Sequence, residues 1–351
     1  YIEQDFARVV LDEAQYIKNP LTQVARAAKR LPAGVRFALT GTPIENRLSE
    51  LWSIFDFLMP GLLGTRESFA KRFESPVEHT EGDSAARLQA LVSPFVLRRV
   101  KEDVVADLPE KIEDTVMAQL TGEQRKLYLA NQDRIAQQVQ HREAGEFKKD
   151  KLKVLAELTK LRQICCDPHL HYADYKAGSA KLDTCMELVH GALDGGHRIL
   201  LFSQFTGMLD IIGKCLAKED IAFLKLTGAS SKESRAKMVA QFQAGEVPVF
   251  LISLKAGGVG LNLTAADVVI HYDPWWNVAA QDQATDRAHR IGQQHTVTVY
   301  KLIAKDTIEE RIMQMQESKR DLVNSVLGGD GISSALFTRE DVLALLGGDG
   351  R

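Results

Sequence analysis

The stretch LISLKAGGVGLNLTAADVVIHYDPWWN, residues 251–277, decides the fold. Two short apolar runs in and beside it predict strands at Val249–Ile252 and Val268–His271. A glycine-rich bend follows the first run, and the residues DPWWN follow the second. Continuous apolar runs of this length are typical of parallel strands that helices cover on both faces. The stretch therefore predicts an α/β fold with a parallel sheet.

The same pattern continues on both sides of this stretch. Further apolar runs predict strands at Arg198–Phe202, Phe223–Leu226 and Val297–Leu302. Helical patterns lie between these strands, and Ser230–Glu233 has the spacing of a capping box. Alternating strands and helices predict a sheet covered by helices. We therefore expect residues 178–305 to form one domain.

Residues 1–60 also alternate between strand and helix. Strands are predicted at Arg8–Leu11 and Arg36–Leu39, and amphipathic helices at Leu21–Lys29 and Leu48–Met59. This region therefore predicts a second α/β element, separate from residues 178–305.

Residues 61–177 differ, because strand patterns vanish there. A capping box at Thr121–Gln124 predicts a helix to Gln140, and a second helix is predicted at Lys148–Cys166. We expect a helical insertion and linker over 61–177. After residues 178–305, a long helix is predicted over 306–328, followed by a tail over 329–351 with one short helix.

Composition is that of an ordinary globular protein. The chain has 351 residues, of which 45% are hydrophobic and 26% charged, and its net charge is −3. Bulk charge therefore does not indicate a nucleic-acid partner, and such a surface would be a local patch. No signal peptide or membrane span is apparent, which predicts an intracellular protein. The four cysteines form no C-x-x-C pair and are expected to be buried and reduced.

The stretch VVLDEAQYIKN, residues 9–19, ends a predicted strand in two carboxylates. An acid at the carboxyl end of a strand lies where open α/β folds bind ligands. Asp12 can hold Mg²⁺, usually through its waters, and Glu13 can orient an attacking water. An Asp-Glu pair is also common on protein surfaces, so the dipeptide alone leaves both readings open.

Two other stretches are equally ambiguous when taken alone. Thr40, Gly41 and Thr42 follow a predicted strand, and their hydroxyls can bond to a neighbouring carboxylate, but the segment can also be a simple turn. Ser253 and Lys255 enter the glycine-rich bend, whose small residues would let a nucleic-acid backbone approach.

The segment QDQATDRAHRIGQ, residues 281–293, carries two arginines. Arg287 and Arg290 are three residues apart on a predicted helix and would share one face, one turn after Gln283. Two guanidiniums on one face can grip phosphate oxygens and stabilise charge in phosphoryl transfer. For an isolated motif of this kind, a solvated basic face is the favoured alternative.

The order of the motifs decides between these readings. Eight stretches in sequence resemble the Swi/Snf-type ATPases, the duplex-DNA translocase branch of helicase superfamily two. They are VVLDEAQYIKN, ALTGTPIENRLSELWSIFDFL, FVLRRVKEDV with LPEK, LRQICCDP, ILLFSQF, FLKLTGASS, SLKAGGVGLNLTAADVVIHYDPWWN and TDRAHRIGQQ. The acidic box reads DEAQ instead of the DEGH or DEAH of many eukaryotic members. With the compact insertion, this resembles a bacterial or archaeal relative.

The resemblance implies two RecA-like lobes with ATP between them. Residues 1–60 would be the end of lobe one, residues 178–305 lobe two, and the helix over 306–328 the brace. By similarity, Asp12 would hold Mg²⁺ and Glu13 would activate water. Arg287 and Arg290 would be arginine fingers beside Gln283, all three contacting the nucleotide.

The resemblance also implies a DNA-facing set of residues. Thr40, Gly41 and Thr42 would couple the nucleotide to DNA. The positions that match the family's DNA-groove segments are Ser203, Gln204, Thr227, Gly228, Ser253, Lys255, Gly257 and Trp276. The expected partner is double-stranded DNA, gripped through its phosphates without sequence preference, and a DNA-bound protein such as RNA polymerase is a further candidate.

A phosphate loop of the form G-x-x-x-x-G-K-S/T is absent from the 351 residues. The nearest approach, Gly213-Lys214, lies in a predicted helix and is followed by Cys215. In the family this loop precedes the acidic box, so we expect the chain to be part of a longer protein and to hydrolyse ATP negligibly alone.

The expected function is that of the C-terminal portion of an ATP-dependent DNA translocase or remodeller. The alternatives are a strand-separating helicase and, for the chain by itself, a non-enzymatic DNA-binding or docking module. We expect a monomer without membrane contact. It would be cytoplasmic and nucleoid-associated in a prokaryote, or nuclear in a eukaryote.

Overall fold

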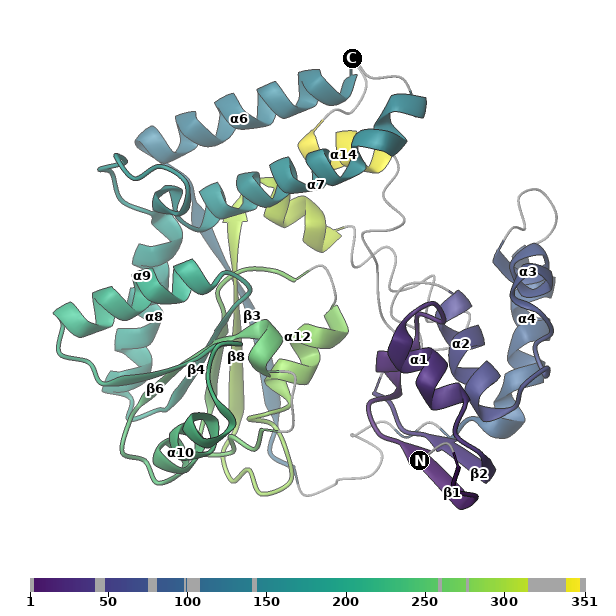
Figure 1. The fold of residues 1–351 in the computed structure, drawn as a ribbon. Coiled ribbons are helices and arrows are strands. Elements are labelled where there is room, and N and C mark those ends of the chain that lie inside the picture. The colour runs from purple at the N-terminus through teal and green to yellow at the C-terminus, as the bar shows by residue number, and fades with distance from the viewer. Residues whose placement is uncertain are drawn as a thin grey trace. The chain divides into compact units, whose positions relative to one another are not determined.

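The chain forms two compact units, shown in Figure 1. The first is made by residues up to Val100 and the second by most residues from Lys101 onward. The computed structural model describes residues 3–41, 48–74, 81–97, 99, 108–140, 144–257, 261–275, 278–314 and 339–347. Among the helices in these ranges, none is long and apolar enough to cross a membrane.

The second unit is built on a six-stranded sheet in the order β3-β8-β7-β4-β6-β5. Every pairing in it is parallel. The strands are β3 (Lys111–Gln119), β4 (Ile199–Ser203), β5 (Phe223–Leu226), β6 (Val249–Ser253), β7 (Val268–His271) and β8 (Val297–Lys305). Parallel neighbours need crossover connections, and helices supply them. The predicted parallel α/β fold is confirmed.

Both faces of the central strands β4, β6 and β7 are buried, because successive side chains enter two separate cores. Ile199 and Leu201 of β4 pack with α8 (Ala180–Asp194) and α9 (Thr206–Lys218). Leu200 and Phe202 point the other way, into a core that includes residues of α10 (Lys232–Gln243) and α12 (Val278–Thr285). The apolar strand residues are therefore needed on both faces, which is why the sequence runs there show no alternation.

Strand β3 contradicts the prediction that residues 61–177 contain no strand. It pairs with β8 over its whole length, from Lys111 opposite Val297 to Gln119 opposite Lys305. The sequence of β3, KIEDTVMAQ, is mostly polar, and most of its side chains are exposed. An edge strand pairs on one side only and does not need an apolar run, so the sequence showed no apolar pattern that would predict a strand. The predicted domain boundaries themselves stay a prediction.

A helical block closes one end of the second unit in Figure 1. It consists of α6 (Gly122–Gln140), α7 (Ala144–Cys166) and the short α14 (Arg339–Leu346), which share one apolar core with Ile308 and Ile312. The predicted helices of this block are confirmed, as is a helix over 308–314. The rest of the predicted brace lies outside the described residues.

The predicted capping box of α6 does not form as expected. The buried Gln124 amide donates to the Ile164 carbonyl at 3.0 Å and accepts from the Ala180 N–H at 3.1 Å. Gln124 therefore joins α6 to α7 and α8, because tertiary hydrogen bonds replaced the local one.

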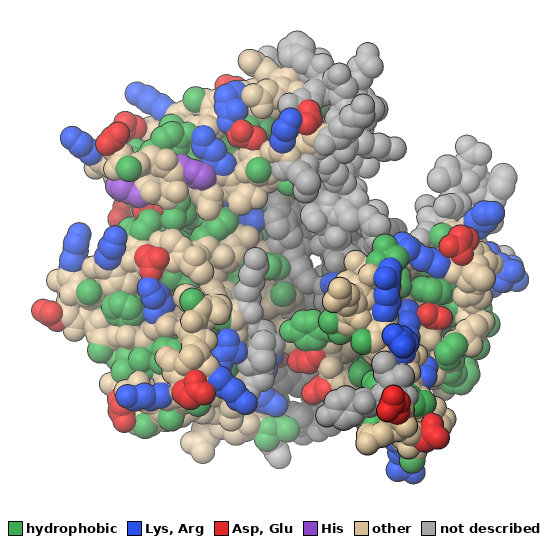
Figure 2. Space-filling model, in the orientation of Figure 1, with side chains coloured by type: hydrophobic (Ala, Val, Ile, Leu, Met, Phe, Trp, Pro, Cys, Tyr) green, Lys and Arg blue, Asp and Glu red, His purple; other side chains and the backbone are tan. Residues whose placement is uncertain are grey.

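The first unit contains a two-stranded parallel sheet of β1 (Phe6–Leu11) and β2 (Ala33–Ala38). Helices α1 (Gln23–Lys29) and α2 (Leu48–Leu58) pack together with it in a small core. The remaining elements are η1 (Ala14–Ile17), α3 (Arg66–Phe69), η2 (Ala70–Glu74), α4 (Glu81–Val92) and η3 (Ser93–Phe95). Apolar side chains lie open on the surface of this unit beside basic ones (Figure 2).

Candidate functional site

The two acids of the first unit lie directly after β1, at its carboxyl end. Asp12 is exposed, and its Oδ1 accepts a hydrogen bond from the Glu13 N–H at 2.9 Å. Glu13 has a left-handed backbone with a φ of 53°. A non-glycine residue seldom adopts this conformation, and such strain is concentrated at functional positions. The backbone therefore leaves the extended conformation of β1 at Glu13.

A hydrogen-bonded relay joins Glu13 to the end of β2. Thr40 Oγ1 donates to Gln15 Oε1 at 2.8 Å, and Gln15 Nε2 donates to Glu13 Oε2 at 2.6 Å. The backbones are tied as well, because the Ala14 N–H donates to the Leu39 carbonyl at 2.9 Å. The acidic box and the Thr40 segment were predicted separately, and the structure brings them together through Gln15.

Gln15 was missed by sequence reasoning, although it is the position at which the box reads DEAQ. An amide can donate to a carboxylate and accept from a hydroxyl at the same time. That dual capacity was the available signal. Gly41 lies in an exposed bend after β2, and Thr42 lies outside the described residues.

The second unit gathers predicted residues at the carboxyl ends of its central strands. Ser203 ends β4 and Ser253 ends β6, and both side chains are buried. The Ser203 hydroxyl donates to Asp273, which follows β7, and the Gln204 N–H donates to both Asp273 oxygens at 3.2 and 3.3 Å. Gln204 itself is half-buried. Asp273 was missed by the sequence analysis, and it fixes the loop after β4.

The other DNA-groove candidates lie at the same edge or beyond the described residues. Thr227 and the exposed Gly228 follow β5. Lys255 and Gly257 lie in α11 (Leu254–Gly257), directly after β6. Trp276 lies outside the described residues. Its neighbour Trp275 is half-buried against an apolar core.

The arginine segment differs from its prediction. Helix α12 ends at Thr285, and residues 286–292 form turns. Arg287 is only 8% exposed, whereas Arg290 is exposed. The prediction that both lie on one helix face is therefore wrong. The Ala288 carbonyl accepts from the buried Gln293 side-chain amide at 3.1 Å and from the Arg290 N–H at 3.1 Å, neither of which is a helical pairing.

Two histidines hold this segment in place. His289 Nε2 bonds to the Pro109 carbonyl at 2.8 Å, just before β3. The buried His271 of β7 bonds to Thr285 Oγ1 at 2.8 Å and stacks on Phe202. Burial, with the nearby Lys301 charge, lowers the His271 pKa from 6.5 to about 3, so this imidazole is neutral. The turn that carries Arg287 and Arg290 is thus tied to β3 and to β7.

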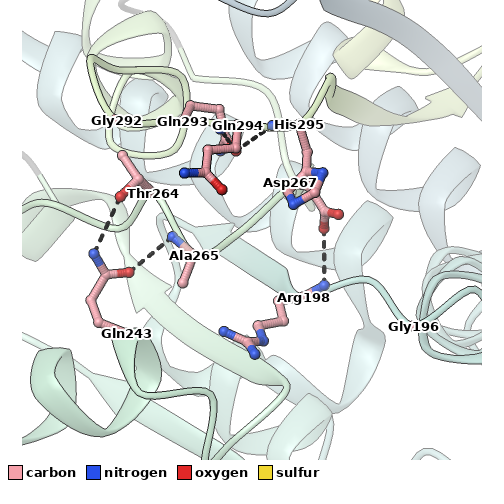
Figure 3. A pocket seen from close by; sticks show the side chains of 10 residues that line it. All are labelled: Gly196, Arg198, Gln243, Thr264, Ala265, Asp267, Gly292, Gln293, Gln294 and His295. Carbon is pink, nitrogen blue, oxygen red and sulfur yellow. Dashed lines mark hydrogen bonds between the residues drawn. The ribbon is translucent and has the colours of Figure 1, made fainter.

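A polar hollow of about 430 Å³ lies elsewhere on the same sheet (Figure 3). It is lined by residues that precede strands, among them Arg198 before β4, Asp267 before β7 and His295 before β8. It therefore opens at the amino edge, opposite Ser203 and Gln204. Ligands of open α/β sheets bind at the carboxyl edge, so this hollow is separate from the candidate site.

Gly213 is a packing residue. It lies inside α9, and a Cβ there would be 3.0 Å from the Phe223 ring. The prediction that Gly213-Lys214 belongs to a helix is confirmed. Of the metal-ligand types, the described residues contain no group of three His, Cys, Asp or Glu that could hold an ion.

Two known domain families match the chain. Residues 2–170 match the SNF2-related domain, and residues 180–292 match the helicase conserved C-terminal domain. The chain belongs to the SNF2 family. An uncharacterized ATP-dependent helicase of Mycoplasma pneumoniae is 42% identical over 98% of this chain and 33% of its own length. The putative ATP-dependent helicase/translocase YwqA of Bacillus subtilis is 41% identical over 95% of this chain and 37% of its own length.

Solved structures agree with the family. The Sulfolobus solfataricus SWI2/SNF2 ATPase core in complex with dsDNA is 37% identical, with a TM-score of 0.57, over 98% of this SNF2-family chain and 73% of that one. The predicted family and RecA-like fold are therefore confirmed. The SNF2-family chain spans about a third of the length of the curated relatives it matches.

Proposed function

We propose that this chain is the C-terminal portion of an ATP-driven motor that moves on double-stranded DNA and displaces or remodels bound protein. The observation that carries the proposal is the arrangement of loops at the carboxyl edge of the six-stranded sheet in the second unit. There, Gln204 and the loop after β7 meet at the ends of adjacent central strands. A structural relative with 37% identity is a core in complex with dsDNA.

We propose that phosphates dominate the DNA contact, which would make binding independent of sequence and sensitive to salt. The residues that would meet the DNA backbone are Gln204, Thr227, Gly228, Lys255 and Gly257. The buried side chains of Ser203 and Ser253 would support the segments after β4 and β6 without contacting DNA themselves.

The nucleotide-contacting residues we propose are those that the family resemblance assigns. Asp12 fits a hydrated Mg²⁺, because oxygen ligands suit this ion and it is commonly held by one or two carboxylates with the nucleotide phosphates. Bound there, Mg²⁺ would neutralise charge on the phosphates. Glu13, held by Gln15, would orient the attacking water. Arg287 and Arg290 would supply positive charge to the nucleotide, with Gln283 nearby in the chain.

An ATPase assay tests this proposal. The 351-residue chain contains no phosphate loop, so we expect negligible turnover from it with or without duplex DNA. The whole protein should show turnover that duplex DNA stimulates. Robust DNA-stimulated turnover by the chain alone would contradict the expectation for the chain, and an unstimulated whole protein would contradict the proposed motor.

A strand-separating helicase is the second candidate, since the Mycoplasma relative carries the word helicase in its name. Two assays on the whole protein separate the candidates. A translocase displaces a triplex-forming strand or a bound protein without releasing single strands, whereas a helicase releases them. If the whole protein binds duplex DNA in a salt-dependent way but nucleotide has no effect, the docking-module reading replaces both.

A further inference from the structure

Arg162 is a buried cation in the helical block that the proposed function leaves unexplained. It lies on α7 and its side chain is 1% exposed. Burying a guanidinium is costly unless its hydrogen bonds are made, and an apolar side chain of similar size would stabilise a core at least as well. Its presence therefore calls for an explanation beyond packing.

The guanidinium reaches two loops at once. Arg162 Nη1 donates to Gln204 Oε1 at 3.0 Å, and Nη2 donates to the Pro274 carbonyl. The guanidinium carbon also lies 5.7 Å from the centre of the Phe205 ring. Gln204 follows β4 and Pro274 follows β7, which are neighbours in the sheet. One side chain from the helical block thus clamps the ends of two adjacent strands.

The clamped loops are connected to each other and to α12. Gln204 Nε2 donates to the same Pro274 carbonyl at 3.4 Å. Next along the loop, the Trp275 N–H donates to Oε1 of the buried Gln281 at 3.3 Å. Gln281 belongs to α12, the helix that ends just before Arg287. A continuous chain of hydrogen bonds therefore runs from α7 through the candidate DNA-facing loops to the helix before the arginine turn.

We propose that Arg162 is a positioning residue for the DNA response of this motor. Its planar fork holds Gln204 and the backbone at Pro274 in one arrangement, so that the loops after β4 and β7 present a single preformed edge to a DNA strand. This inference rests on the proposed function, and it adds the helical block to the machinery that senses DNA.

The sharpest test is Arg162→Lys in the whole protein. Lysine keeps the charge and the apolar stem but cannot reach Gln204 and Pro274 together. Loss of a charge-assisted hydrogen bond predicts about a tenfold rise in the duplex-DNA concentration that half-saturates ATP turnover. Maximal turnover at saturating DNA should stay within about twofold of the wild type. Anisotropy of labelled duplex DNA should show the same tenfold loss.

Arg134→Lys is the matched control. Arg134 also belongs to the helical block, but its guanidinium pairs with Glu157 at the surface. We expect that variant to match the wild type in both measurements. If Arg162→Lys and Arg134→Lys respond alike, or if Arg162→Lys lowers maximal turnover without moving the half-saturating DNA concentration, the proposal is wrong.

A double-mutant cycle with Gln204→Ala keeps the inference testable if Arg162→Lys also lowers stability. When both residues act through one contact, Arg162→Lys should cost less than about twofold further in DNA affinity once Gln204 is replaced. Fully multiplicative losses would overturn the proposal. A wild-type protein without DNA-stimulated turnover would instead refute the proposed function, and this inference with it.

Discussion

Each unit contains a parallel sheet, and the two sheets are buried to different extents. In the second unit, every residue of β4, β6 and β7 is buried. In the first unit, Val10 of β1 is 55% exposed and Phe37 of β2 is 48% exposed. Helices α1 and α2 pack on Val9, Leu11 and Ala38 and so cover one face only.

The candidate residues of the two units are therefore supported by their sheets to different extents. Parallel sheets are found almost only with both faces covered, and two strands are marginal by themselves. Val10 and Phe37 therefore lie on the less supported face of this two-stranded sheet. The acids after β1 rest on this one-sided support, whereas Gln204 and the arginine turn rest on a closed core.

The largest expected effect concerns the arginine turn of the second unit. In the whole protein, Arg287→Ala or Arg290→Ala should lower DNA-stimulated ATP turnover by roughly a thousandfold, because arginine fingers stabilise charge in phosphoryl transfer. Duplex binding, measured by anisotropy, should change little. Arg287→Ala should also lower the melting temperature, since Arg287 is buried and Arg290 is exposed.

Arg125→Ala, at an exposed position of α6, is the control for a lost surface charge. If DNA affinity falls in parallel with turnover, Arg287 and Arg290 contact DNA instead of the nucleotide. That result would assign the arginine turn to the DNA contact instead of the nucleotide contact.

The next effect tests the comparison of the sheets directly. Leu201→Ala in β4 should cost about 2 to 5 kcal/mol of unfolding free energy, because it opens a cavity in a closed core. Val10→Ala in β1 should stay within about 0.5 kcal/mol, as is usual for exposed positions. Urea unfolding of the intact chain, followed by circular dichroism, measures both. Similar costs at the two positions would remove the distinction between the units.

A pH effect should come from His271 at the centre of the closed sheet. Its pKa is about 3 in the folded chain and 6.5 ordinarily. Between these values the unfolded chain binds a proton there and the folded chain does not, so stability falls as the pH drops from 6.5 towards 3. The contribution is about 1.4 kcal/mol per pH unit.

His271→Gln provides the measurement for that effect. Glutamine can still bond to the Thr285 hydroxyl but does not titrate, so the variant should lose this part of the slope in unfolding free energy between pH 6.5 and pH 3. An unchanged slope would show that His271 is not kept neutral by burial.

The smallest effect concerns the relay of the first unit. Gln15→Ala removes the hydrogen bonds to Glu13 and Thr40. We expect about a tenfold loss of ATP turnover in the whole protein, typical of one lost hydrogen bond to a charged group. Gln23→Ala, at an exposed position of α1, is the control. Wild-type turnover from Gln15→Ala would mean that the strained turn at Glu13 is sufficient by itself.

The elements of the covered sheet were predictable because burial on both faces demands a continuous apolar run. Val268–His271 and Phe223–Leu226 were predicted with the boundaries that the structure has. Strand β3 was not predictable, since an exposed edge strand can be polar. Helix α12 ends earlier than predicted. Beyond its end, His289 bonds to the Pro109 carbonyl and Gln293 donates to the Ala266 carbonyl, both distant in sequence.

The sequence by itself determined the family and the parallel α/β fold, since these follow from residue type, local period and motif order, and it named candidate site residues that remain a prediction. Only the tertiary structure decided which of them meet. Gln15 joins Glu13 to Thr40, which lies 25 residues further along the chain. Arg162 joins Gln204 to Pro274, and Pro274 lies 112 residues beyond Arg162. No local pattern encodes such contacts, because each depends on how strands and helices far apart in the chain are brought to one edge of a sheet.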